Sequence, residues 1–196
     1  MKTAIIFLAI FQGMYCFSRP PLRNVELKWK PTSSLEDLFE IQLSDILQTK
    51  IKFGNIIDAR GSSQPNKVGE NRENSKNVLA VETSSDVAAF VSENVKNLLK
   101  KRGLNIVSDE EDYTLSGELL DLFVTEENIY KGNVAIKYSI KKKDKTIWTS
   151  TAQGSSRKFG RSYSYENYLE SISESIFSSV QNLLENESFR KQLKSP

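Results

Sequence analysis

The chain has 196 residues, 38% of them hydrophobic, and this size fits one domain with short appendages. Its 27 basic and 25 acidic residues nearly cancel, leaving a formal charge of +2, which argues against a nucleic-acid binder with a basic surface. The absence of histidine excludes Ser-His-Asp and Cys-His catalysis and histidine zinc sites. A single cysteine excludes an intrachain disulfide and a cysteine metal cluster.

Residues 1–18 form a predicted secretory signal. Lys2 precedes an apolar run over residues 4–11, which is too short to span the roughly 30 Å core of a bilayer and fits the hydrophobic region of a signal peptide. Two cleavage sites stay open. A lipoprotein-type cut would leave Cys16 as an acylated first residue, although the bulky Tyr15 departs from the small residue usual before such a cysteine. A signal-peptidase cut after Ser18 would remove the cysteine.

Residues 19–49 are predicted to form an N-terminal extension. Apolar and charged residues alternate over Asn24–Trp29, which favours a short edge strand. Apolar residues then recur at helical spacing over residues 35–47, after a serine-rich start, and predict a helix. The alternative for that segment is a loop that places its apolar side chains under the sheet.

The main domain is predicted over residues 50–196, beginning with a buried strand over residues 50–59. The polar residues 61–77, with their glycines and proline, follow as a loop longer than most connections. Residues 83–102 predict an amphipathic helix, because polar capping residues stand at its start and Gly103 follows its end.

Three strands of an antiparallel meander are predicted over residues 113–125, 134–140 and 146–154, with a basic hairpin turn at residues 142–145. A second long amphipathic helix begins at Tyr165. Helices grouped beside an antiparallel sheet indicate an α+β domain. We therefore expect a mostly antiparallel sheet of about four strands with two amphipathic helices packed on one face.

The segment 154–164 is the candidate binding loop. Its glycines and serines offer backbone amides, and Arg157, Lys158 and Arg161 could hold an anion near the start of the following helix. Phe159 lies between these cations. The alternative is a glycine-hinged connection in which Phe159 packs and the charges are solvated.

Asp58, Arg60 and Arg72 are candidate structural or contact residues. Asp58 and Arg60 follow a predicted strand, where they could supply a carboxylate and a guanidinium to a site or form a local ion pair. Arg72 belongs to the polar loop over residues 61–77, a second candidate contact surface. The acidic residues 109–112 lack the ligand spacing of a calcium loop, so we interpret them as a solvated turn and predict no metal site.

Several segments together resemble the YajG-like family of bacterial envelope lipoproteins, with a similarity that covers roughly residues 45–193. These segments are Lys50–Arg60, Val68–Arg72, Leu98–Gly103, Leu115–Leu119, Ile147–Trp148 before Gly154, Tyr165–Tyr168 and Phe189. The resemblance implies an α+β envelope domain that an N-terminal lipid attaches to a membrane. It implies no enzymatic activity and supplies no catalytic residues. Tyr15 before Cys16 departs from the anchored pattern.

Together these features predict a non-enzymatic, exported envelope protein, lipoprotein-like, that acts as an accessory or structural partner of an envelope assembly. We expect protein partners in the envelope, membrane attachment through Cys16 if it is acylated, no cofactor and no nucleic acid. The expected location is the periplasmic side of the bacterial envelope, at the outer membrane if lipidated. The main alternative is a lipid- or glycan-binding module. A third hypothesis is an enzyme that uses carboxylates such as Asp58 or Glu118.

Overall fold

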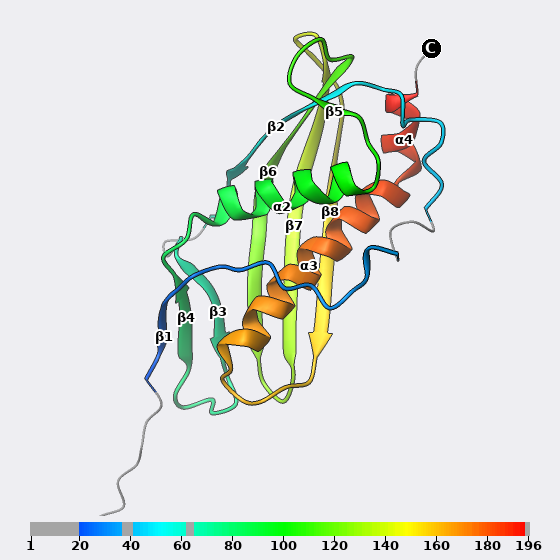
Figure 1. Ribbon diagram of the computed structural model, residues 1–196. Helices are drawn as coiled ribbons and strands as arrows, with labels where there is room; N and C mark the ends of the chain where they lie inside the picture. The colour runs from blue at the N-terminus through cyan, green and yellow to red at the C-terminus, as the bar shows by residue number, and fades with distance from the viewer. Residues whose placement is uncertain (1–19, 37–40, 62–64, 195–196) are drawn as a thin grey trace, which may run out of the picture.

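The computed structural model describes residues 20–36, 41–61 and 65–194; the predicted signal with Cys16 lies outside them. Eight strands form one mixed sheet, and α2 and α3 cross the same face of it (Figure 1). None of the described helices has the length and hydropathy of a membrane-spanning helix. The elements in chain order are β1 (Leu22–Val25), β2 (Ile51–Asp58), β3 (Lys67–Asn71), β4 (Leu79–Thr83), α2 (Val87–Lys101), β5 (Ile106–Val107), β6 (Tyr113–Glu126), β7 (Tyr130–Lys142), β8 (Lys145–Lys158), α3 (Tyr165–Glu185) and α4 (Glu187–Leu193).

The predicted meander is confirmed as β6, β7 and β8, which pair antiparallel. The inward positions of β7 are buried and the outward ones are at least partly exposed, as its alternating sequence indicates. A bulge interrupts the pairing of β6 with β7 between Leu119 and Asp121. β7 and β8 are longer than predicted because backbone pairing continues through mostly polar residues at both of their ends.

The sheet has eight strands and is partly parallel, so the expectation of about four mostly antiparallel strands was wrong. The long β6 accepts two parallel neighbours on one edge: β2 along Tyr113–Leu119 and β3 along Val124–Glu126. β4 continues the sheet beyond β3, and β1 pairs parallel with β4. The segment between β2 and β6 contains α2, which supplies the crossover that parallel strands require.

One unexpected strand comes from a segment that was interpreted as a loop. β3 lies within the predicted loop 61–77, where Val68 is its one aliphatic residue. Its position between β4 and β6 provides hydrogen bonds on both edges, and this pairing does not depend on an apolar pattern. β1 (Leu22–Val25) lies at the edge of the sheet in the N-terminal extension, where an edge strand was predicted over Asn24–Trp29; the observed strand begins two residues earlier and ends at Val25. Residues 41–47 do not form the predicted helix; they are mostly turn, and their buried apolar side chains support the loop alternative.

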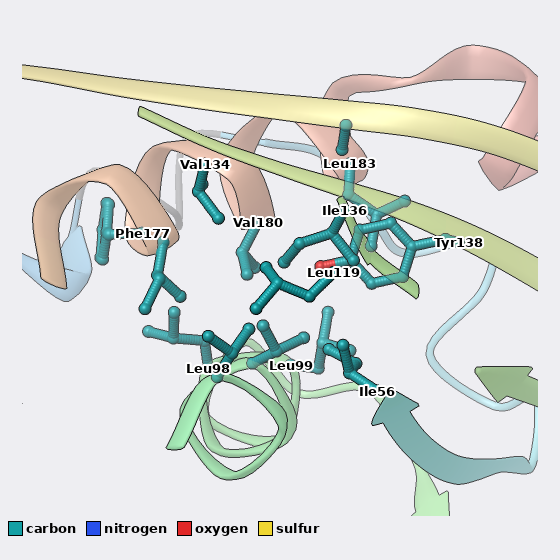
Figure 2. Packing of buried hydrophobic residues seen from close by; sticks show 14 of the residues in the cluster. Ile56, Leu98, Leu99, Leu119, Val134, Ile136, Tyr138, Phe177, Val180 and Leu183 are labelled. Carbon is teal, nitrogen blue, oxygen red and sulfur yellow. The ribbon is translucent and has the colours of Figure 1, made fainter. Parts of the chain in front are cut away.

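The hydrophobic core fills the space between the sheet and its two long helices. The side chains that meet there (Figure 2) are Leu98 and Leu99 from α2, Leu119, Ile136 and Tyr138 from the sheet, and Phe177 and Val180 from α3. Each is no more than 3% exposed. α2 begins as predicted, because the Asp86 side chain accepts a 2.9 Å hydrogen bond from the amide of Ala89.

The backbone of α3 lies directly against β8 at Gly154. A Cβ atom at this glycine would come within 3.0 Å of the Ser175 carbonyl oxygen and of the Ser179 amide nitrogen. Ser156 and Ser179 add hydrogen bonds between the strand and the helix. β8 therefore continues to Lys158, and the loop that we predicted from Gly154 onward was wrong at its start: the Gly-Ser run serves close packing, and the connection to α3 is residues 159–164.

Candidate functional site

Four segments that are distant in sequence meet at one end of the sheet, the lower end in Figure 1. They are the start of β1, the β3–β4 turn (residues 72–78), the β6–β7 turn (residues 127–129) and the β8–α3 connection (residues 159–164). The amide of Leu22 donates a 2.7 Å hydrogen bond to the Tyr163 hydroxyl, and the Ser162 hydroxyl bonds to the Glu73 carboxylate. We call this surface the loop end.

A buried carboxylate organises the loop end. Glu126, only 1% exposed, accepts a 2.6 Å hydrogen bond from the amide of Tyr163 and a 2.7 Å hydrogen bond from the Tyr168 hydroxyl. Burial, together with the Glu126 carboxylate, raises the pKa of Tyr168, which keeps this donor protonated. Tyr163 adopts a left-handed backbone conformation with φ of 51°, and these contacts hold it there.

A second set of bonds fixes the connection around Arg161. The Tyr130 hydroxyl donates to the Arg161 carbonyl at 2.6 Å and accepts from the Ser164 amide at 2.9 Å. The Asn167 side chain also donates to the Arg161 carbonyl, at 3.0 Å. A Cβ atom at Gly160 would lie within 3.0 Å of the Asn167 amide group and would displace that side chain. The connection is therefore a fixed shape held from β6, β7 and α3.

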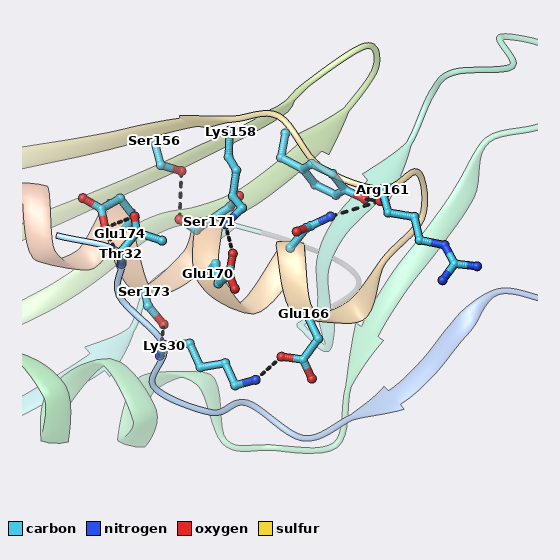
Figure 3. Close-up of polar contacts among 12 residues, drawn as sticks. Lys30, Thr32, Ser156, Lys158, Arg161, Glu166, Glu170, Ser171, Ser173 and Glu174 are labelled. Atoms are coloured by element: carbon cyan, nitrogen blue, oxygen red, sulfur yellow. Dashed lines mark hydrogen bonds and ion pairs between the residues drawn. The ribbon is translucent and has the colours of Figure 1, made fainter.

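At this fixed loop end and the adjoining end of β8, one aromatic and two cationic side chains are exposed. Phe159 is 84% exposed, and Arg157 and Arg161 are exposed. Within the described part of the chain, neither guanidinium forms a hydrogen bond or an ion pair; the Arg161 side chain extends away from α3 in Figure 3. Lys158, the fourth predicted binding residue, forms an ion pair with Glu170 of α3. The structure thus separates Lys158 from the three exposed residues.

Asp58, Arg60 and Arg72 have local ionic partners. Arg60 donates to both carboxylate oxygens of Asp58, at 2.9 and 2.7 Å, and to the Pro65 carbonyl at 2.7 Å. Its side chain is only 7% exposed, and its hydrogen bonds lower the pKa of Asp58. This geometry supports the ion-pair alternative at the exit of β2. Arg72 pairs with the buried Glu70, which also bonds to Lys67.

Three of the acidic residues 109–112 contact lysines at the start of β2. The Asp112 carboxylate accepts a 2.8 Å hydrogen bond from the amide of Lys50, and the ammonium groups of Lys50 and Lys52 face Glu110 and Glu111. In residues 20–36, 41–61 and 65–194, no group of three or more Asp, Glu, Cys or His side chains is arranged to hold a metal ion.

Two hollows lie away from the loop end. One, of about 620 Å³, runs between β2 and α2, where Ile57 is 58% exposed beside Ala88, Ala89 and Ser92. The other, of about 390 Å³, adjoins the bulge of β6 and is lined mainly by polar side chains: Asp121, Asn133, Gln153, Ser155 and Asn182. Partial desolvation raises the pKa of Asp121 in this second hollow.

Sequence patterns did not reveal the residues that fix the loop end. Glu126 follows the predicted strand over residues 113–125, and nothing in its sequence neighbourhood marks it as buried. Tyr130 precedes the predicted strand over residues 134–140, and Tyr168 lies in the predicted amphipathic helix that begins at Tyr165, without a signal that marks its hydroxyl as a hydrogen-bond donor. Their three side chains become one network only when β6, β7 and α3 assemble.

No protein-family model matches this chain, and no curated protein matches its sequence. Solved structures do share its fold. Protein XCC0632 from Xanthomonas campestris, of the family DUF330, aligns with a TM-score of 0.53 at 8% identity, over 88% of this chain and 95% of that one. An uncharacterized protein aligns with a TM-score of 0.51 at 7% identity, over 84% and 97%. These similarities show the α+β fold; membership of the YajG-like family stays a prediction.

Proposed function

We propose that this protein is an exported, non-enzymatic component of the bacterial cell envelope that is attached through its N-terminal segment and binds another envelope component through its loop end. The observation that carries the proposal is Phe159, which is 84% exposed on a connection fixed by partly buried hydrogen bonds. An aromatic side chain held in water by a rigid support is typical of a binding surface. The signal-like residues 1–18 support export.

The geometry favours binding over chemistry at this surface. The hydroxyls of Tyr130 and Tyr168 and the carboxylate of Glu126 are engaged in bonds that fix the loop. Arg157 and Arg161 beside Phe159 supply two positive charges without a partner among the described residues. Such a surface suits a component with anionic and apolar groups.

Two measurements test this proposal. The intact mass of the native protein from its own membranes should begin at Cys16 with added acyl chains, or at Arg19; a mass that includes residues 1–15 contradicts export with cleavage. A benzoylphenylalanine at position 159 of the full chain should crosslink to an envelope component on irradiation in cells. The same residue at position 144, in the hairpin turn at the opposite end of β8, is the control. Absence of any crosslink from position 159 overturns the assigned surface.

The hollow beside Gln153 supports a second candidate, a glycan-binding module. Its amide, hydroxyl and carboxyl groups are the types that recognise sugar hydroxyls, and Asn182 already donates a 2.7 Å hydrogen bond to the Gln153 carbonyl. The outward face of the sheet carries polar side chains such as Lys137 and Glu118 at 3.0 Å, which favours a sugar over an acyl chain. Asn133→Ala should abolish saccharide binding in calorimetry; unchanged binding would exclude this site.

A further inference from the structure

The position of β1 determines which end of the domain an attachment through the preceding residues would bring near a membrane. Leu22 begins β1, and its amide bonds to the Tyr163 hydroxyl at the loop end. Cys16 precedes Leu22 by six residues, and a chain of that length spans at most about 21 Å. A lipid on Cys16 would therefore hold the loop end within this distance of the bilayer.

The opposite end of the sheet lies beyond the reach of that attachment when the strands stand away from the bilayer. β8 has 14 residues, and at about 3.3 Å per residue its two ends are roughly 43 Å apart. The hairpin at the far end carries Lys142, Lys143 and Lys145 around Asp144. This hairpin is more basic than the loop end, so charge alone would favour the hairpin as the membrane-facing surface. Attachment through Cys16 favours the loop end instead.

The charges of the loop end suit an anionic surface. Two acidic groups here are paired with lysines, Glu127 with Lys131 at 2.6 Å and Glu170 with Lys158, whereas Glu73 keeps its charge and accepts a hydrogen bond from the Ser162 hydroxyl. The guanidinium groups of Arg157 and Arg161 have no such partners among the described residues. Guanidinium groups bind phosphate oxygens through paired hydrogen bonds, and an exposed aromatic ring between them favours the interfacial layer of a bilayer.

We propose that the loop end is the membrane-facing surface of the protein and docks on the anionic phospholipid headgroups of the bilayer that holds its N-terminal segment. Arg157 and Arg161 contact the phosphates, and Phe159 enters the interfacial layer. This inference rests on the proposed function, because it names the component that the same surface binds. The attachment supplies proximity, and the loop end orients the domain with the sheet pointing away from the membrane.

The test compares matched charge removals in the full chain. Binding is measured to phosphatidylcholine vesicles with and without 25% phosphatidylglycerol. The affinity for the anionic vesicles divided by the affinity for the neutral ones is the readout, and an acyl chain on Cys16 leaves this ratio unchanged because it binds both kinds of vesicle. Arg157→Gln with Arg161→Gln should lower this ratio about 10- to 30-fold, and salt should abolish the difference. Lys142→Gln with Lys143→Gln removes the same charge at the far hairpin and should leave the ratio unchanged.

An equal or larger effect of the hairpin variant, or no effect of the loop variant, overturns the inference. The crosslinker at position 159 gives an independent result, because phospholipid adducts are expected there and not at position 144. Crosslinks from position 159 to protein alone would leave the proposed function intact and refute membrane docking. Absence of all crosslinks would refute both.

Discussion

Substituting Gly154 by alanine tests how closely α3 lies on the sheet. The added methyl group would come within 3.0 Å of two backbone atoms of α3, the Ser175 carbonyl oxygen and the Ser179 amide nitrogen, and 2.9 Å from the Ser179 Cβ. Backbone atoms cannot turn aside as a side chain can, so the helix must move away from β8. Forced overpacking of this kind costs about 2–3 kcal/mol of unfolding free energy.

The assay is urea unfolding followed by circular dichroism and by tryptophan fluorescence. In thermal unfolding of a domain of this size, the same loss of unfolding free energy lowers Tm by about 4–12 °C. Gly61→Ala is the matched control, because nothing lies within 4 Å of its Cβ position; it should leave stability unchanged or raise it by up to about 1 kcal/mol. If Gly154→Ala costs less than about 1 kcal/mol with an unchanged m-value, the close approach of α3 to β8 is wrong.

Three further predictions concern the buried tyrosines. Tyr168→Phe removes a donor to the buried Glu126 carboxylate and should cost about 1.5–3 kcal/mol in urea unfolding; a loss under 0.5 kcal/mol would show that the bond is not formed. Tyr138→Phe removes a fully buried hydroxyl that has no hydrogen-bond partner among the residues that the structure describes, so the unfolding free energy should stay the same or rise by about 1 kcal/mol, and a loss above 1 kcal/mol contradicts this. Burial raises the pKa of Tyr130, Tyr138 and Tyr168 in the folded state, whereas unfolded tyrosines ionise near pH 10. Their contribution to stability is therefore complete below pH 10 and decreases as the pH rises further. Absorbance at 295 nm should show these tyrosines ionising only at the pH where circular dichroism reports unfolding. Ionisation of all the tyrosines while the circular dichroism spectrum is still native would refute this prediction.

Assignment of the loop end as the contact surface changes the interpretation of its basic residues. Of the four residues first grouped as one binding loop, Lys158 joins α3 through Glu170, and Arg157, Phe159 and Arg161 stay exposed. A substitution at Lys158 is therefore expected to affect stability, whereas substitutions at the two arginines are expected to affect binding. The spacing of the four residues in sequence carries no signal that separates these roles.

Local sequence patterns determined the elements whose own periodicity is strong. The alternation over residues 134–140 identified β7, and the apolar stripe and cap of residues 83–102 identified α2. Period and capping act within one segment, so they need no knowledge of a partner. Because these signals identify helices and strands one segment at a time, they were enough to predict the α+β class.

Only the tertiary structure decided the size and direction of the sheet and the composition of the loop end. β3 is polar and forms because β4 and β6 pair with both of its edges. Gly154 resembles a loop residue, and its role appears only where α3 crosses β8. Glu126 accepts hydrogen bonds from Tyr163, 37 residues away in the sequence, and from Tyr168, 42 residues away. Strand pairing, the close approach of a helix and buried hydrogen bonds each need a second segment of the chain. The periodicity of one segment does not indicate which other segment will contact it.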